Sequence, residues 1–127
     1  MEKRIGVLLL CLTLLGCTKE EIVPRDYPIA VTRGVTNISN GSALFQGEIT
    51  FTPTPIVDHG FIWNSLRFPT LTDPYSEIKS LGSKTGAGSF QFSIPNGLVK
   101  GRTYAMCAYV KSSKDIVYGK TIEFVAK

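Results

Sequence analysis

Apolar and polar residues alternate over most of the chain after residue 28, which predicts short strands rather than helices. The clearest case is residues 43–51, where every second residue is apolar or glycine and the intervening positions are mostly polar. Clusters of Gly, Pro, Asn, Ser and Asp separate such segments at the spacing typical of an all-β sandwich. We expect seven strands, over residues 29–35, 43–51, 57–65, 75–80, 89–94, 104–110 and 116–125.

The expected third strand, residues 57–65, indicates how the core is filled. Alternation places Phe61 and Trp63 on one face of this strand and Ile62 on the other. Trp63 is the single tryptophan, so we expect it to be the largest anchor of the core. The long link that follows, residues 66–74, holds two prolines and predicts no strand of its own.

The sixth strand is preceded by a turn with a recognisable pattern. Leu98, Gly101 and Tyr104 resemble the tyrosine corner of fibronectin type III domains, in which the chain crosses between two sheets. Two positions depart from that pattern, because Lys100 stands where the family has proline and Arg102 where it has threonine. The resemblance implies a seven-stranded immunoglobulin-like (fibronectin type III-like) sandwich over residues 29–127, with Tyr104 hydrogen-bonded back to the turn.

The N-terminus has the pattern of a secretory signal. A short charged segment precedes an apolar run over residues 5–15, which is too short to cross a bilayer. Residues 14–17, Leu-Leu-Gly-Cys, resemble a bacterial lipobox. The resemblance implies a signal peptide over residues 1–16 and a lipid anchor on Cys17, so that one expected partner is a membrane.

Residues 17–28 are expected to be the lipidated cysteine and a flexible tether. The Lys-Glu-Glu sequence at residues 19–21 resembles the surface-export signal of some Gram-negative lipoproteins, which implies an outer-membrane lipoprotein exposed on the cell surface. A polar tether alone would serve equally well in a periplasm-facing protein, so that alternative stays open.

Composition excludes several classes of function. The formal net charge is +4, and the lysines are scattered singly, so the sequence lacks a nucleic-acid-binding footprint. His59 is the only histidine, no Gly-x-Ser-x-Gly motif is present, and the acidic residues lack the spacing of a metal site. We therefore expect no catalytic residues, no metal site and no cofactor. With Cys11 removed and Cys17 lipidated, Cys107 would be the last thiol, which allows no disulfide.

A non-catalytic binding, adhesion or spacer module is the function that these features favour. Ile62, Cys107 and Tyr109 would form an apolar stripe on the outer face of one sheet, with Tyr118 near its rim. Ile62, Tyr109 and Tyr118 are the candidate ligand contacts, for a protein or a glycan. The alternatives are a glycan-capture accessory of a polysaccharide-uptake system and, less favoured, a hydrolase. The stripe would be unavailable if a lysine-rich loop or the 66–74 link covered it.

Overall fold

The computed structural model describes residues 26–65 and 68–127. The expected signal peptide, the lipid-attachment residue Cys17 and most of the tether lie outside the described residues. No helix in the described part is long and apolar enough to cross a membrane. This part of the chain is all β.

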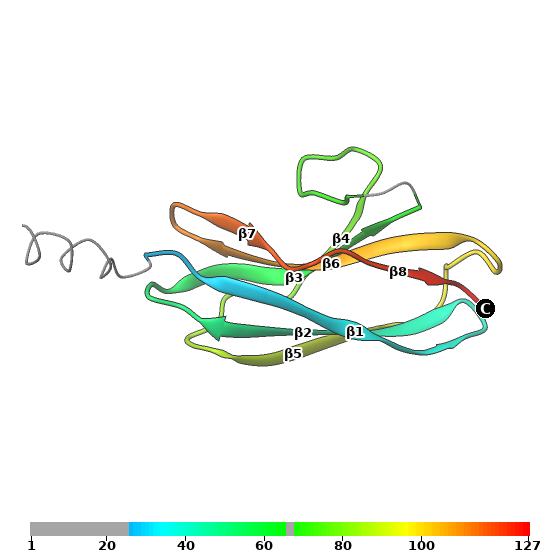
Figure 1. Ribbon diagram of the computed structural model, residues 1–127, viewed down its shortest axis with the longest axis horizontal. Helices are drawn as coiled ribbons and strands as arrows, with labels where there is room; N and C mark the ends of the chain where they lie inside the picture. The colour runs from blue at the N-terminus through cyan, green and yellow to red at the C-terminus, as the bar shows by residue number, and fades with distance from the viewer. Residues whose placement is uncertain (1–25, 66–67) are drawn as a thin grey trace, which may run out of the picture.

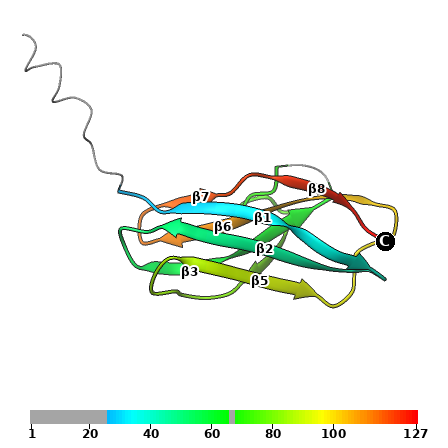
Figure 2. The same ribbon diagram turned by 60° about the horizontal axis from the view of Figure 1, so that its bottom comes forward.

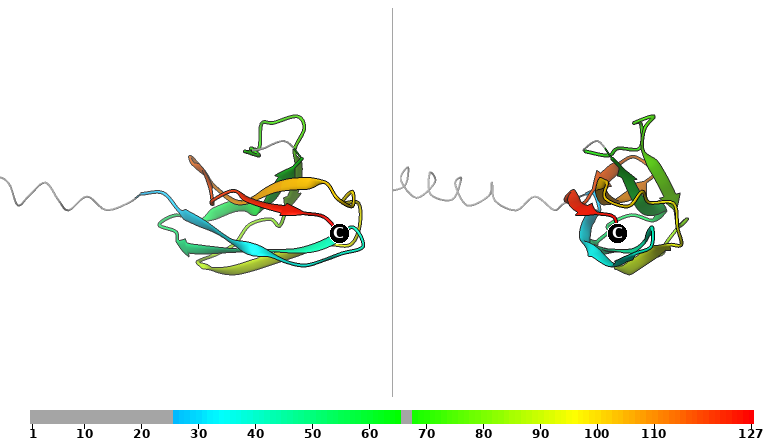
Figure 3. Two further views of the ribbon diagram at one scale, coloured as in Figure 1. Left: turned by 45° about the vertical axis from the view of Figure 1, so that its right-hand side comes forward. Right: turned by 90° about the vertical axis from the view of Figure 1, so that its right-hand side faces the viewer.

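Two antiparallel sheets pack face to face, as the view along the strands in Figure 3 shows. One sheet has the order β1-β2-β5, and the other has the order β4-β3-β6-β7 with β8 also paired to β6. Figure 2 shows the first sheet in front. The strands are β1 (Ile29–Ser39), β2 (Ser42–Phe51), β3 (Ile56–Asn64), β4 (Glu77–Ser80), β5 (Gly88–Ile94), β6 (Thr103–Ser112), β7 (Ile116–Tyr118) and β8 (Ile122–Val125). The sandwich architecture is confirmed, with eight strands where the sequence predicts seven.

β1 extends further than the alternation predicts, because the turn that ends it has only two residues. Asn40 and Gly41 both have positive φ, 50° and 77°, as a type I′ hairpin turn requires. Ser39 therefore lies opposite Ser42, and the segment expected to be a turn continues the β1–β2 ladder.

The core lies between the sheets and is built from the inward positions that the alternation predicts. Phe45, Phe61 and Met106 are fully buried in it. The ring of Phe45 contacts those of Phe61, Trp63 and Phe124 at centroid distances of 5.2–5.7 Å. Trp63 is only partly buried, so Phe45 rather than Trp63 holds the centre of the cluster.

The expected seventh strand is interrupted by one extra residue near Gly119. Tyr118 lies opposite Tyr109, and continuing that register would place Thr121 opposite Met106; instead Ile122 occupies that position. A shift of one residue moves side chains to the other face of a sheet. Val117 and Phe124 therefore both contact the core although they lie seven positions apart, an odd spacing that would place them on opposite faces of an uninterrupted strand.

The interruption is stabilised from the opposite sheet by Thr32 of β1. The Ala108 backbone N–H donates to Thr32 Oγ1 at 3.0 Å, while the Ala108 carbonyl accepts from the Gly119 N–H at 2.8 Å. Both Thr32 and Ala108 are buried. The hydroxyl thus replaces the ladder partner that β6 lacks at this point.

We expect Thr32→Val to destabilise the fold by about 1–3 kcal/mol, because it leaves a buried N–H without an acceptor while keeping the side-chain shape. Thr32→Ser, which keeps the hydroxyl, should cost less. Urea unfolding of the two variants measures the difference. A valine variant as stable as the parent protein would show that the hydrogen bond contributes nothing.

The turn between β5 and β6 crosses from one sheet to the other at Leu98, Gly101 and Tyr104. The Val99 N–H donates to the Tyr104 hydroxyl at 2.8 Å, five residues upstream, which is the contact of a tyrosine corner. Gly101 has φ of 85°, in the region that favours glycine. Leu98 and Tyr104 are both buried, so the corner is packed as well as hydrogen-bonded.

Candidate functional site

The outer face of the β3–β6 sheet is covered. Residues 68–76, which we call the strap, rise above this sheet in Figure 1, and Leu71 packs against Ile62, Cys107 and Tyr109. These three side chains are 0–1% exposed. The expected exposed stripe is therefore wrong for Ile62, Cys107 and Tyr109, because the strap occupies the place that a ligand would need.

Polar contacts hold the strap on the sheet. Buried Asn64 donates through Nδ2 to Asp73 Oδ2 and to Ser76 Oγ, both at 3.0 Å. Tyr118 lies at the rim with 39% of its surface exposed, and its hydroxyl accepts from the Leu71 N–H at 3.2 Å. Of the three candidate contacts, only Tyr118 reaches solvent, and its polar end already holds the strap.

Asp58 and Tyr109 form a hydrogen-bonded pair at one end of the covered face. The Tyr109 hydroxyl donates to Asp58 Oδ2 at 2.7 Å, and Asp58 Oδ1 accepts from Ser80 and from the Gly82 N–H. Burial acts to raise the pKa of Asp58, but these donors and the His59 N–H outweigh it and leave the pKa lowered. Burial and the neighbouring carboxylate raise the pKa of Tyr109. The charged Asp58 carboxylate and the neutral Tyr109 hydroxyl therefore form a structural hydrogen bond between β3 and β6.

Cys107 is enclosed under the strap, with its thiol 3.7 Å from the Pro69 carbonyl oxygen. Burial raises its pKa to about 11. We expect iodoacetamide at pH 8 to alkylate Cys107 in the folded protein at least about a hundredfold more slowly than in the unfolded chain, because the thiolate is both scarce and inaccessible. Mass spectrometry of the Cys107 peptide measures this rate. Equal rates in the presence and absence of denaturant would show that the strap opens freely.

The His59 side chain is buried and engaged with the Gly82 carbonyl and with Phe90. The His59 ring is 6% exposed, its Nδ1 lies 2.7 Å from the Gly82 carbonyl oxygen, and its edge packs on Phe90 at a centroid distance of 4.8 Å. A ring held in this way supports the 81–88 loop. Among residues 26–65 and 68–127, no cluster of three or more His, Cys, Asp or Glu could hold a metal ion.

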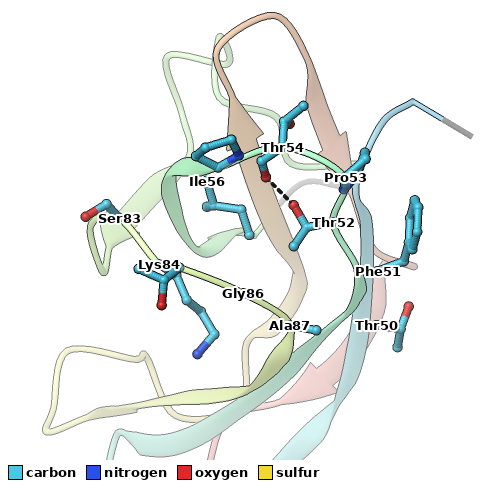
Figure 4. Close-up of a pocket in the computed structure, with 12 residues that line it drawn as sticks. Thr50, Phe51, Thr52, Pro53, Thr54, Ile56, Ser83, Lys84, Gly86 and Ala87 are labelled. Atoms are coloured by element: carbon cyan, nitrogen blue, oxygen red, sulfur yellow. Dashed lines mark hydrogen bonds between the residues drawn. The ribbon is translucent and has the colours of Figure 1, made fainter.

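An open groove of about 710 Å³ lies at the end of the sandwich where β1 begins and β2 ends. Two segments form it: the β2–β3 turn and the loop before β5, which meet because the Lys84 N–H donates to the Ile56 carbonyl at 3.2 Å. Figure 4 shows Ser83 and Lys84 on one side and Thr50 and Phe51 on the other. The lining residues are Thr50, Phe51, Thr52, Pro53, Thr54, Pro55, Ile56, Ser83, Lys84, Thr85, Gly86 and Ala87.

The lining combines hydroxyl groups, apolar surface and a single cation. Five of its residues are threonine or serine, and none is acidic. Phe51 is 38% exposed. The Thr52 hydroxyl donates to the Thr54 carbonyl at 2.5 Å, which fixes the proline-rich turn. This mixture of apolar wall and a few polar groups is typical of a small-ligand site.

Neither segment of the groove is marked as functional by the sequence. The Thr-Pro-Thr-Pro run at residues 52–55 and the glycine-rich loop at residues 82–88 each indicate a turn. Their meeting depends on the pairing of Ile56 with Lys84, two residues that are 28 positions apart in the chain. The one feature of the sequence that could have indicated the groove is Lys84, a lysine within the glycine-rich loop.

Comparison with protein-family profiles and with curated protein sequences finds no match. Among solved structures, the chain is similar to the sensor domain of the anti-sigma factor RsgI4 from Pseudobacteroides cellulosolvens, with a TM-score of 0.60 and 12% identity. The match covers 81% of this chain and 97% of the sensor domain. At this identity the similarity shows a shared fold and no more.

Proposed function

We propose that this protein is a lipid-anchored, non-catalytic binding module of the bacterial cell envelope, with a fibronectin type III-like sandwich. The observation that carries the binding role is the groove, a ligand-sized site on a rigid all-β support. The lipobox at Cys17 supports the anchor, and the contact between Val99 and Tyr104 supports the fibronectin type III-like assignment. Surface exposure on the outer membrane is part of the proposal and rests on residues 19–21.

The alternatives draw less support. Glycan capture by outward tyrosines loses its motivation, because Tyr109 is buried and the Tyr118 hydroxyl is engaged with the strap. A hydrolase would need an accessible acid or base, whereas His59 is buried against Phe90. The structural neighbour is described as a sensor domain, and a sensor role would also need a ligand site such as the groove.

Site-specific photocrosslinking on intact cells tests the binding role. A benzophenone side chain at Ser83, exposed at the groove, should give discrete crosslinked products, whereas one at Val99, which is 48% exposed in the β5–β6 turn at the other end, should not. Identical products from both positions, or none from Ser83, would contradict a binding function at the groove.

Membrane fractionation tests the anchor separately. The full chain should sediment with the membrane, and Cys17→Ala should abolish processing by lipid attachment. A Cys17→Ala protein that is processed and retained exactly as the parent would contradict lipid anchoring. Protease treatment of intact cells then distinguishes a surface-exposed domain from a periplasm-facing one.

A further inference from the structure

Lys84 is a half-buried lysine with no charged partner. The ion pairs of the described residues join Arg33 to Glu48 and Lys114 to Asp26, and the Lys84 ammonium takes part in neither these nor any hydrogen bond within residues 26–65 and 68–127. A partly buried ammonium gains more from a nearby negative charge than a fully exposed one does, because the surrounding dielectric is lower. An anion entering the groove would supply the missing charge.

The Lys84 side chain lies along its own loop, against Gly88. A Cβ at position 88 would lie 3.4 Å from Lys84 Nζ, which is an ordinary van der Waals distance. Gly88 also has φ of 145°, where other residues are strained. Lys84 is one of the residues that line the groove, and Figure 4 shows its side chain there.

The rest of the lining indicates what the anion is attached to. Phe51 offers an exposed aromatic ring, which suits the apolar face of a sugar. The Thr54 hydroxyl is buried and has no hydrogen-bond partner among the described residues, and four further hydroxyl side chains line the groove. Hydroxyl-rich lining with one aromatic and one cation matches a sugar that carries a carboxylate.

The geometry points to the groove as a binding site for an acidic sugar, with Lys84 pairing with the carboxylate and Phe51 packing on the ring. This inference rests on the proposed function and names its ligand class. An acidic peptide would satisfy Lys84 equally, but it would leave the hydroxyl groups and the aromatic ring without a matching surface.

Calorimetric titration of the full chain in detergent tests the inference, with oligogalacturonate and its fully methyl-esterified form as probes. The ester keeps the sugar and removes the charge, so the acid should bind at least about tenfold more tightly, because only the acid forms a charge-assisted hydrogen bond with the Lys84 ammonium. Lys84→Met should weaken binding of the acid by a similar factor, and Lys84→Arg should restore most of it. Lys100→Met, an exposed lysine in the β5–β6 turn, should change nothing.

The inference would be overturned by equal affinity for acid and ester, by no effect of Lys84→Met, or by tighter binding of a poly-glutamate peptide than of oligogalacturonate. If neither glycan binds while Ser83 still crosslinks on cells, the ligand class is wrong and the binding function stands. If Ser83 also fails to crosslink, the proposed function fails with it.

Discussion

Gly119→Ala should destabilise the fold by about 3 kcal/mol or more, because the new methyl group would overlap the backbone of the opposite sheet. A Cβ at this position would lie 2.6 Å from the Thr32 backbone nitrogen, and it would also overlap the Thr32 hydroxyl. Residue 119 must therefore be glycine, because β1 passes so close to the interruption between β7 and β8 that no side chain fits there. Urea unfolding of the full chain, followed by tryptophan fluorescence, measures the loss.

Gly34→Ala is the matched control, since a Cβ at Gly34 in β1 meets no atom within 4 Å. Its stability should stay within about 0.5 kcal/mol of the parent. Removing the Thr32 side chain in a Gly119→Ala/Thr32→Ala double variant should restore little, because the backbone nitrogen still blocks the methyl group. A Gly119→Ala protein as stable as Gly34→Ala would refute the close packing of β1 on Gly119 between β7 and β8.

The sequence predicts the parts of the fold that depend on local alternation. The inward residues of β2 and β6 could be identified because each strand alternates without a break, and both strands form as expected. The division of the last strand into β7 and β8 could not be predicted. It depends on Thr32, which lies 87 positions from Gly119 in the chain and meets it only when the two sheets pack.

The candidate site was harder to predict for a related reason. Period-two alternation separates the two faces of a sheet, but it does not say whether a loop covers the outer one. Ile62 and Tyr109 are correctly placed on the face away from the main core, and the strap then buries them through Leu71. The groove arises from two turns whose sequences each indicate only a change of direction, so its existence follows from topology.

The covered face gives the second large effect, which we expect from Tyr109→Ala. Tyr109 is fully buried and is among the largest side chains enclosed by the described structure. Truncating a buried aromatic residue typically costs about 3–5 kcal/mol. The variant also removes the hydroxyl that donates to Asp58 Oδ2, so a partly buried carboxylate loses a donor. Thermal and urea unfolding should both show the loss, and Cys107 should become reactive as the strap loosens.

Tyr109→Phe separates the packing of the ring from the hydrogen bond. It keeps the ring against Leu71 and should cost only about 1–2 kcal/mol. A lowered pKa of Asp58 in the folded state stabilises the protein above the unfolded pKa, and this contribution is lost as the pH falls through the folded value. With one donor removed, Tyr109→Phe should lose less stability on acidification than the parent. If the two proteins lose the same stability on acidification, the Tyr109 hydroxyl does not stabilise the charged form of Asp58, and the ring alone accounts for the role of Tyr109 beneath the strap.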